Sequence, residues 1–204
     1  MPVEKVQGGV VALTGHRNYA DRAALYRALD KIKAEKYYLG GARGFDTDAL
    51  EYISKTQPGT IRTVVVPNRL IDQPVAAQEA TRIYASEVVE LKNSGPGRYQ
   101  VRNQYMVDHA DRLEAFYDGR PTGGTVNTMN YAERKGVPVD INPLIEFDKN
   151  VILEKSEGDF LEWLRDCQRA EVSKMSVKSL VTVYLQKIPR ERWKEILEQL
   201  HRLK

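Results

Sequence analysis

Length, composition and charge limit the classes of protein to which this chain can belong. Its 204 residues carry a net charge of +3, and 42% of them are hydrophobic, which is enough apolar material for one globular domain with an appendage. So small a charge gives no electrostatic reason to expect strong binding to DNA or to a membrane, although it leaves room for a local basic patch.

Cysteine, histidine and hydropathy exclude further classes. The single cysteine, Cys167, rules out an intramolecular disulfide, and there is no secretory pattern at the N-terminus, so we expect a cytoplasmic protein. No apolar run approaches the length of a membrane span, so no membrane association is expected. The three histidines lie far apart and match no zinc spacing, so we expect no metal site.

Short apolar runs alternate with amphipathic stretches through the first two-thirds of the chain. In chain order, we expect a strand at 9–15, a helix at 21–36, a strand at 37–41, a helix at 46–57 and a strand at 61–67. Then follow a helix at 74–86, a strand at 87–91, a loop at 93–100, a helix at 101–111, a strand at 112–119, a helix at 125–136 and a strand at 137–143. This alternation predicts an α/β fold with a mostly parallel sheet flanked by helices.

The pattern changes after residue 143. Apolar residues recur at helical spacing in 160–167, 177–188 and 193–200, with no strand between them. We therefore expect an α/β domain at 1–146 and a helical C-terminal extension at 147–204. The extension could pack on the sheet, mediate self-association or bind a partner.

Polar residues and glycines gather where predicted strands end. The residues that we expect to bind a ligand are Thr14, Gly15, His16 and Arg17 after the first strand, Gly41, Arg43 and Gly44 after the second, Arg102 in the helix at 101–111, and Asp118, Gly123, Gly124, Thr125, Asn127 and Thr128 after the fifth strand. The carboxyl ends of parallel strands share one edge of the sheet, where such sheets bind ligands. One cleft could therefore be lined by all of these loops.

Phosphate is the ligand group that these loops suit best. Glycines let backbone N–H groups approach an anion, and a following helix N-terminus adds a favourable dipole. The loop at 122–128 is the best candidate for such a cradle, against the alternative of an ordinary left-handed turn with a hydroxyl cap. Arg43 could face a phosphate or pair locally with Asp46 or Asp48, and Arg102 could clamp a phosphate or form a surface ion pair. Asp46 is expected first as the N-cap of its helix.

Four segments together resemble a known superfamily. They are LTGHR (13–17), GGARGFDTDALEY (40–52), RNQYMVDHADRLEAFYDG (102–119) and TGGTVNTMNYAERKGVPV (122–139). Their order and spacing are similar to the SLOG superfamily, which unites the DNA-processing protein DprA (Smf) with the LOG phosphoribohydrolases, and most similar to its YpsA-like branch. The resemblance covers residues 8–143. It implies a modified Rossmann fold whose glycine loops bind nucleotides or nucleotide-derived ligands, and it implies a homo-oligomer.

The resemblance also bears on whether the ligand is cut. LOG enzymes carry a motif PGGxGTxxE, whose Glu is catalytic, whereas this chain has PTGGTVNTMNYAE, with Asn130 or Tyr131 where that Glu is expected. This departure weakens the hydrolase interpretation. The carboxylates left as candidate catalytic groups are Asp118, Glu133 and Asp46. A carboxylate can stabilise the oxocarbenium-like state of such a cleavage.

Three functions follow in order of preference. We expect a protein that binds a nucleotide carrying ribose and phosphate, such as AMP, ADP-ribose or an NAD-like species, as a sensor or carrier; no obligatory cofactor is implied. The first alternative is a LOG-type phosphoribohydrolase that cleaves the N-glycosidic bond of a nucleotide. The second is a DprA-like accessory protein that binds single-stranded DNA on arginines and stacking tyrosines. The tyrosines could instead pack in the core with their hydroxyl groups at its rim. The low net charge of the chain favours that interpretation over DNA binding.

Overall fold

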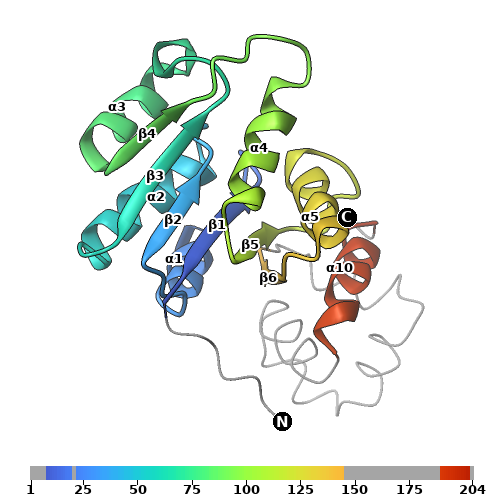
Figure 1. Ribbon diagram of the computed structural model, residues 1–204. Coiled ribbons are helices and arrows are strands. Elements are labelled where there is room, and N and C mark those ends of the chain that lie inside the picture. Colours follow the sequence, from blue (N-terminus) through green and yellow to red (C-terminus); the bar gives the residue numbers. More distant parts are fainter. Residues whose placement is uncertain (1–7, 20–21, 145–188, 203–204) are drawn as a thin grey trace, which may run out of the picture.

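The computed structural model describes residues 8–19, 22–144 and 189–202 (Figure 1). Its elements, in chain order, are β1 (Val10–Gly15), α1 (Arg22–Leu29), β2 (Lys36–Leu39), α2 (Phe45–Thr56), β3 (Ile61–Val66), the short 3-10 helix η1 (Leu70–Asp72), α3 (Val75–Tyr84), β4 (Glu87–Glu90), α4 (Arg98–Asp108), β5 (Arg112–Tyr117), α5 (Gly124–Lys135), β6 (Val139–Pro143), η2 (Arg190–Arg192) and α10 (Trp193–Arg202). The predicted α/β class is confirmed.

All six strands form one parallel sheet in the order β4-β3-β2-β1-β5-β6. The chain first builds outward from β1 to β4, and α4 then carries it back so that β5 pairs with the other side of β1. The direction of winding therefore reverses between β1 and β5. In parallel sheets a crevice forms outside the carboxyl ends of the strands at such a reversal, so a ligand site is expected beside the ends of β1 and β5.

The alternation of side chains along the strands divides the core into two layers. On β1, Val11 and Leu13 face the layer of α1 and α2, with α3 beside it, whereas Ala12 faces the layer of α4, α5 and α10. On the four central strands β1, β2, β3 and β5, most residues that face the two layers are buried, as expected for a parallel sheet that is covered on both faces. The sheet therefore holds the loops at its upper edge on a rigid support.

The C-terminal helix α10 belongs to the second layer. Ile196 and Leu197 are fully buried against α5 and the edge of the sheet, as the predicted apolar stripe requires. A side chain at Gly119 would collide with the carbonyl of Leu197, so the close approach of α10 depends on that glycine, whose φ is +87°. The other two predicted stripes, 160–167 and 177–188, lie outside the described residues. No helix in the described part of the chain is both long and apolar enough to cross a membrane.

Several predicted boundaries were wrong by more than the usual fraying of helix ends. The helix expected at 21–36 ends at Leu29, because the next residues turn so that Ile32 and Ala34 enter the core before β2 begins. The loop expected at 93–100 is shorter, since α4 begins at Arg98, behind a left-handed Gly97. Burial of Ile32 and Ala34 therefore decided the first boundary, and the left-handed backbone of Gly97 decided the second.

Candidate functional site

A cleft of about 500 Å³ lies at the carboxyl ends of β1, β2 and β5. That volume falls in the range of small-molecule sites, roughly 300–1,000 Å³. The predicted site residues that line it are Thr14, Gly15, His16, Arg17, Arg43, Asp46, Arg102, Gly123, Gly124 and Thr125. Three loops and the start of α4 therefore meet around one hollow, as the shared edge of the sheet predicted.

Positive charge dominates the wall of this cleft. The arginines that line it are Arg17, Arg43, Arg102 and Arg120, and the one carboxylate in the lining is Asp46. Within the described chain, the side chains of Arg17 and Arg43 make no ion pair and no hydrogen bond. Guanidinium groups without a protein counter-ion are available for an anionic ligand.

Arg102 lies deepest of these cations. Its side chain is only 8% exposed, and one guanidinium nitrogen donates to the carbonyl of Gly40 while lying 3.9 Å from an Asp46 carboxylate oxygen. Its Nε has no hydrogen-bond partner among the described residues. Because a buried guanidinium is costly unless its donors are satisfied, an additional acceptor in the cleft would stabilise it.

Asp46 is tied into the turn that surrounds Arg43. Its Oδ2 accepts a hydrogen bond of 3.0 Å from the backbone N–H of Ala42. The expectation that Asp46 is the N-cap of α2 is wrong: the helix begins at Phe45, and the capping position is Gly44, whose φ of +81° suits glycine. Burial raises the pKa of Asp46, opposed by Arg102 and by the backbone N–H of Ala42. The carboxylate therefore already has partners.

A cluster of three polar side chains, His16, Asp118 and Arg120, connects the loop after β1 to the loop after β5. His16 Nε2 lies 3.1 Å from Asp118 Oδ1, while Asp118 accepts hydrogen bonds from the backbone N–H and the Nε of Arg120, at 3.1 and 2.7 Å. Arg120 in turn donates to the carbonyl of Asn18 at 2.7 Å. Burial would raise the pKa of Asp118, but His16 and Arg120 outweigh it and lower that pKa to about 2. Asp118 is thus an ionised structural anchor and does not line the cleft.

The N-terminus of α5 opens onto the cleft. Its capping residue, Gly123, provides no side chain, and a Cβ placed there would meet nothing within 4 Å. Gly124 is almost as open, since only Asn103 Nδ2 lies within reach, at 3.9 Å. The N–H groups of the first turn therefore combine access with the positive end of the helix dipole, the usual arrangement for binding phosphate.

Other predicted residues lie outside this cleft. Gly41 packs against Val64 on the next strand, and Gly44 packs against the carbonyl of Arg17. Asn127 and Thr128 line a separate, smaller hollow between α4 and α5. Glu133 lies further along α5, where its carboxylate is 3.4 Å from Lys194 Nζ of α10.

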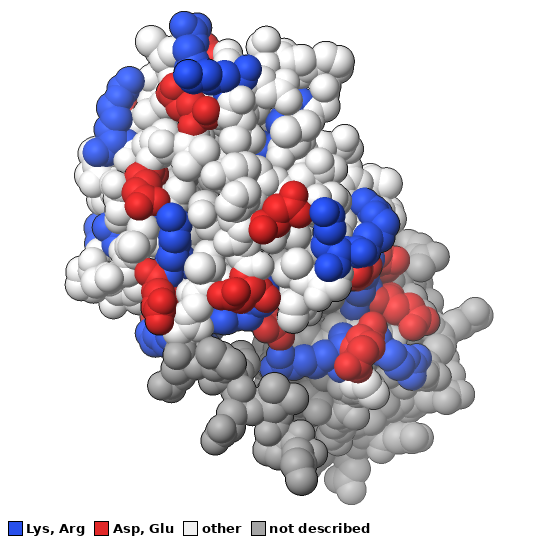
Figure 2. Space-filling view, in the orientation of Figure 1, with Lys and Arg blue, Asp and Glu red and all other residues white. Residues whose placement is uncertain are grey.

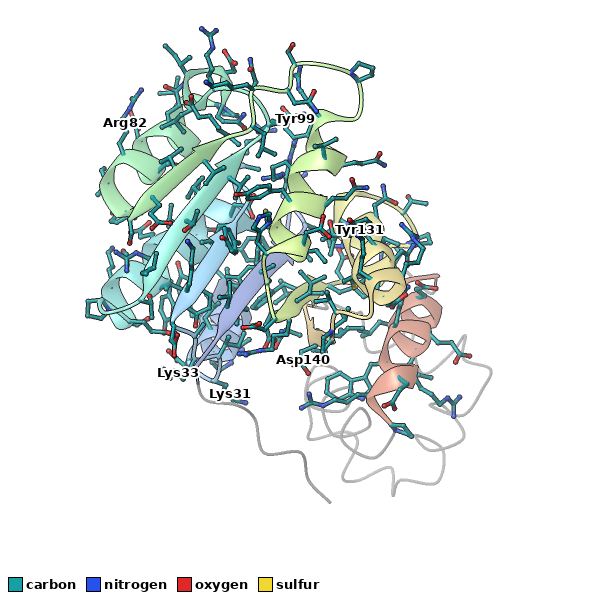
Figure 3. All side chains as sticks on the ribbon, viewed as in Figure 1. Lys31, Lys33, Arg82, Tyr99, Tyr131 and Asp140 are labelled. Carbon is teal, nitrogen blue, oxygen red and sulfur yellow. The ribbon has the colours of Figure 1, made fainter. Side chains whose placement is uncertain are left out.

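Sequence reasoning missed three contributors to the cleft. Arg120 and Asn18 were not selected, although Arg120 follows Asp118 directly in a loop that was. From the sequence, Tyr99 was one of the tyrosines that could stack with single-stranded DNA or pack in the core. Its half-exposed ring has the guanidinium carbons of Arg98, Arg17 and Arg102 at 5.2, 5.8 and 6.0 Å from its centre, within the range of cation–π attraction (Figure 3).

Comparisons with known proteins place the fold but assign no family. No family model matches the chain. A curated relative, an uncharacterized prophage-derived protein of Bacillus subtilis named YoqJ, is 27% identical over 133 residues, which cover 55% of this chain and 77% of the relative. The solved structure of DNA processing protein A from Helicobacter pylori superposes with a TM-score of 0.53 at 18% identity, covering 88% of this chain and 81% of that protein. The chain therefore has a Rossmann-like fold that is similar to the fold of that protein.

Proposed function

We propose that this protein binds a nucleotide that carries ribose and phosphate, in the cleft at the carboxyl ends of β1, β2 and β5, and acts as a sensor or carrier. The observation that carries this proposal is the meeting of cations without counter-ions and an uncapped helix N-terminus. Arg17 and Arg43 line the same hollow as Gly123 and Gly124, and the Nε of the buried Arg102 has no hydrogen-bond partner among the described residues. An anion there would satisfy all three kinds of group.

The proposed binding mode follows from the placement of these groups. A phosphate would sit against the first turn of α5, within reach of Arg43 and Arg17. The half-exposed ring of Tyr99 at the mouth offers a flat surface on which a base could stack. A sensor or carrier needs no catalytic carboxylate. This agrees with the structure, in which Asp46 and Asp118 already contact other groups of the protein.

Thermal denaturation with a panel of nucleotides tests the proposal. A ligand that binds only the folded state raises the melting temperature by mass action, so AMP, ADP-ribose or NAD should produce a shift. Inorganic phosphate and pyrophosphate serve as controls for charge alone and should produce a smaller one. If no nucleotide exceeds these controls, the proposal is wrong.

Single-stranded DNA is the second candidate ligand. The Helicobacter pylori protein of similar fold is described as binding single-stranded DNA, and Tyr99 with its three guanidinium neighbours resembles a stacking platform. Against it, basic and acidic groups are interspersed over the face in Figure 2, with no continuous basic surface. Binding of an oligonucleotide should weaken steeply with salt, and Tyr99→Ala should reduce it where Tyr99→Phe does not. Undetectable affinity at low salt would remove this candidate.

Cleavage of the ligand has the least support. Of the candidate carboxylates, Glu133 pairs with Lys194 away from the cleft, Asp118 is held by His16 and Arg120, and Asp46 is bonded to the backbone. Asn130 and Tyr131, at the position of the expected catalytic Glu, line the other hollow. Incubation with AMP, dCMP or NAD should therefore release no free base. Release of base under binding conditions would make the protein a hydrolase.

The expected homo-oligomer stays a prediction of the resemblance. Sedimentation or light scattering at several concentrations would measure it, with and without nucleotide. A mass of one chain, 23.2 kDa, at every concentration would contradict it.

A further inference from the structure

The hollow between α4 and α5 has an unusual chemistry. It measures about 180 Å³, and five of the eight residues that line it are carboxamides, namely Gln100, Asn103, Gln104, Asn127 and Asn130. The helices that hold it lie side by side in Figure 1. Its volume is below that of most whole-ligand sites, roughly 300 Å³ and more, so it suits one ring system of a larger ligand.

Contacts within the protein leave much of this hydrogen-bonding capacity unused. Asn103 donates to Thr128 Oγ1 at 2.8 Å, and Asn130 accepts from Lys194 Nζ at 2.6 Å. Within the described chain, the side chains of Gln100, Gln104 and Asn127 have no hydrogen-bond partner. Each carboxamide has an acceptor oxygen and two donor hydrogens, and the edges of nucleobases present the same combination of donors and acceptors.

Contacts between α4 and α5 define the walls of the hollow. The hydroxyl of Tyr131, a lining residue of α5 that is labelled in Figure 3, donates to the Asp108 carboxylate of α4, at 2.9 and 3.0 Å. Asn103 of α4 lines both this hollow and the arginine-rich cleft. The two hollows are therefore neighbours with one shared wall, next to the start of α5.

We propose that this hollow binds the second base of a ligand that has two nucleoside units joined through phosphates. The phosphates and the first nucleoside would occupy the arginine-rich cleft, and the second base would reach past Asn103 to Gln104 and Asn127. This inference rests on the proposed nucleotide function and narrows it to a dinucleotide-type small molecule. Carboxamide contacts to the base edge supply selectivity, while the arginines supply affinity for phosphate.

A matched pair of ligands tests the second base directly. ADP-ribose and diadenosine diphosphate share the adenosine and the two phosphates, and differ in whether the second ribose carries a base. Binding to the full chain should be at least tenfold tighter for diadenosine diphosphate, as measured by calorimetry. In Gln104→Leu this gain should vanish, because the side chain keeps its size but loses its amide, while the affinity for ADP-ribose should be unchanged.

The outcomes distinguish the inference from the function on which it rests. Equal affinity of the unmodified protein for both ligands, or an equal loss for both in Gln104→Leu, overturns the second-base site and leaves the nucleotide function standing. Absence of binding by either ligand overturns both. A third outcome also overturns the inference. If Gln104→Leu loses affinity only for a short single-stranded oligonucleotide, and the parent protein gains nothing from the second base of the dinucleotide, the hollow binds nucleic acid. Melting temperatures of the variant verify that it is folded.

Discussion

The two glycine loops of this protein look alike in sequence and differ in what their glycines do. In the loop after β2, the backbone is packed: a side chain at Gly44 would collide with the carbonyl of Arg17, and one at Gly40 with the guanidinium of Arg102. In residues 122–124, which end the loop after β5, a side chain at Gly123 would meet nothing within 4 Å, unlike Gly119 earlier in that loop, which packs against α10. The first loop needs glycine to let protein segments approach each other, and the second keeps space for something else.

This difference separates support from binding. The packed loop places Arg43 and Asp46 and anchors Arg102, whereas the open loop presents the N-terminus of α5 to the cleft. Changes at the buried groups of the packed loop, and at Asp118 at the start of the loop after β5, should therefore act mainly on stability. Changes at Arg43, which the packed loop presents to the cleft, and at the open glycines before α5 should act mainly on ligand binding. Five predictions test this comparison, from the largest expected effect to the smallest.

Phe45→Ala should produce the largest loss of stability. The ring of Phe45 is 1% exposed and packs on Phe116, with centroids 4.9 Å apart, beneath the packed loop. Removing a buried phenyl ring leaves a cavity and typically costs about 3–5 kcal/mol of unfolding free energy. Urea denaturation measures it, and a loss of less than about 1 kcal/mol would show that the packed loop is not supported by this ring.

Gly44→Ala should be the next most destabilising change. The position has a φ of +81°, and the added Cβ would collide with the backbone carbonyl of Arg17, so strain and overpacking together should cost about 2–4 kcal/mol. Urea denaturation again provides the measurement. A melting temperature equal to that of the parent would mean that the loop is not packed as described.

Asp118→Asn should remove a pH-dependent part of the stability. Because the folded pKa of Asp118, about 2, lies below its ordinary value of 3.8, ionised Asp118 stabilises the fold above about pH 4 by an amount on the order of 2 kcal/mol. This contribution is lost as the pH falls from about 4 to about 2. The variant should therefore be less stable than the parent near neutral pH, with the difference shrinking through that window. A difference that stays constant with pH would contradict the assignment.

Arg43→Ala should weaken ligand binding without changing stability. Arg43 is exposed and makes no ion pair in the described chain, so only the ligand should lose a contact. Loss of one charge-assisted hydrogen bond corresponds to about a tenfold loss of affinity. Arg82→Ala on α3, away from Tyr99 in Figure 3, is the matched control and should bind as the parent does. Equal affinity of both variants would make the Arg43 turn purely structural.

Gly124→Ala should have the smallest effect of the five changes, and in contrast to Gly44→Ala it should cause no loss of stability. Alanine at the start of a helix is tolerated, and the added Cβ would meet only Asn103 Nδ2 at 3.9 Å, so the melting temperature should stay equal or rise slightly. The methyl group would stand between the α5 backbone and a bound phosphate, so nucleotide binding should weaken by a few-fold. Unchanged binding would show that the phosphate lies elsewhere in the cleft.

Much of the architecture could be predicted from the sequence because it depends on local periodicity. The strand–helix alternation placed nearly every element within about two residues, and the common edge of parallel strands correctly grouped the loops that form the cleft. The prediction failed where long-range packing intervened. The end of α1 depends on the burial of Ile32, and the capping of α2 depends on how Gly44 meets Arg17.

The same division holds for the candidate site. The sequence by itself determined which loops meet and that they carry glycines and arginines, because strand order along the chain and residue identity suffice for that. Only the tertiary structure decided which side chains face the cleft. Thr128 bonds to Asn103 and to the carbonyl of Gly124, and Gly41 packs against Val64, so neither lines the cleft. Tyr99 and Arg120 do line the cleft, although neither was among the site residues predicted from the sequence. A glycine in a tightly packed turn and a glycine in a ligand-binding loop look the same in the sequence, because neither has a side chain. Only the atoms around each glycine in the folded protein distinguish the two.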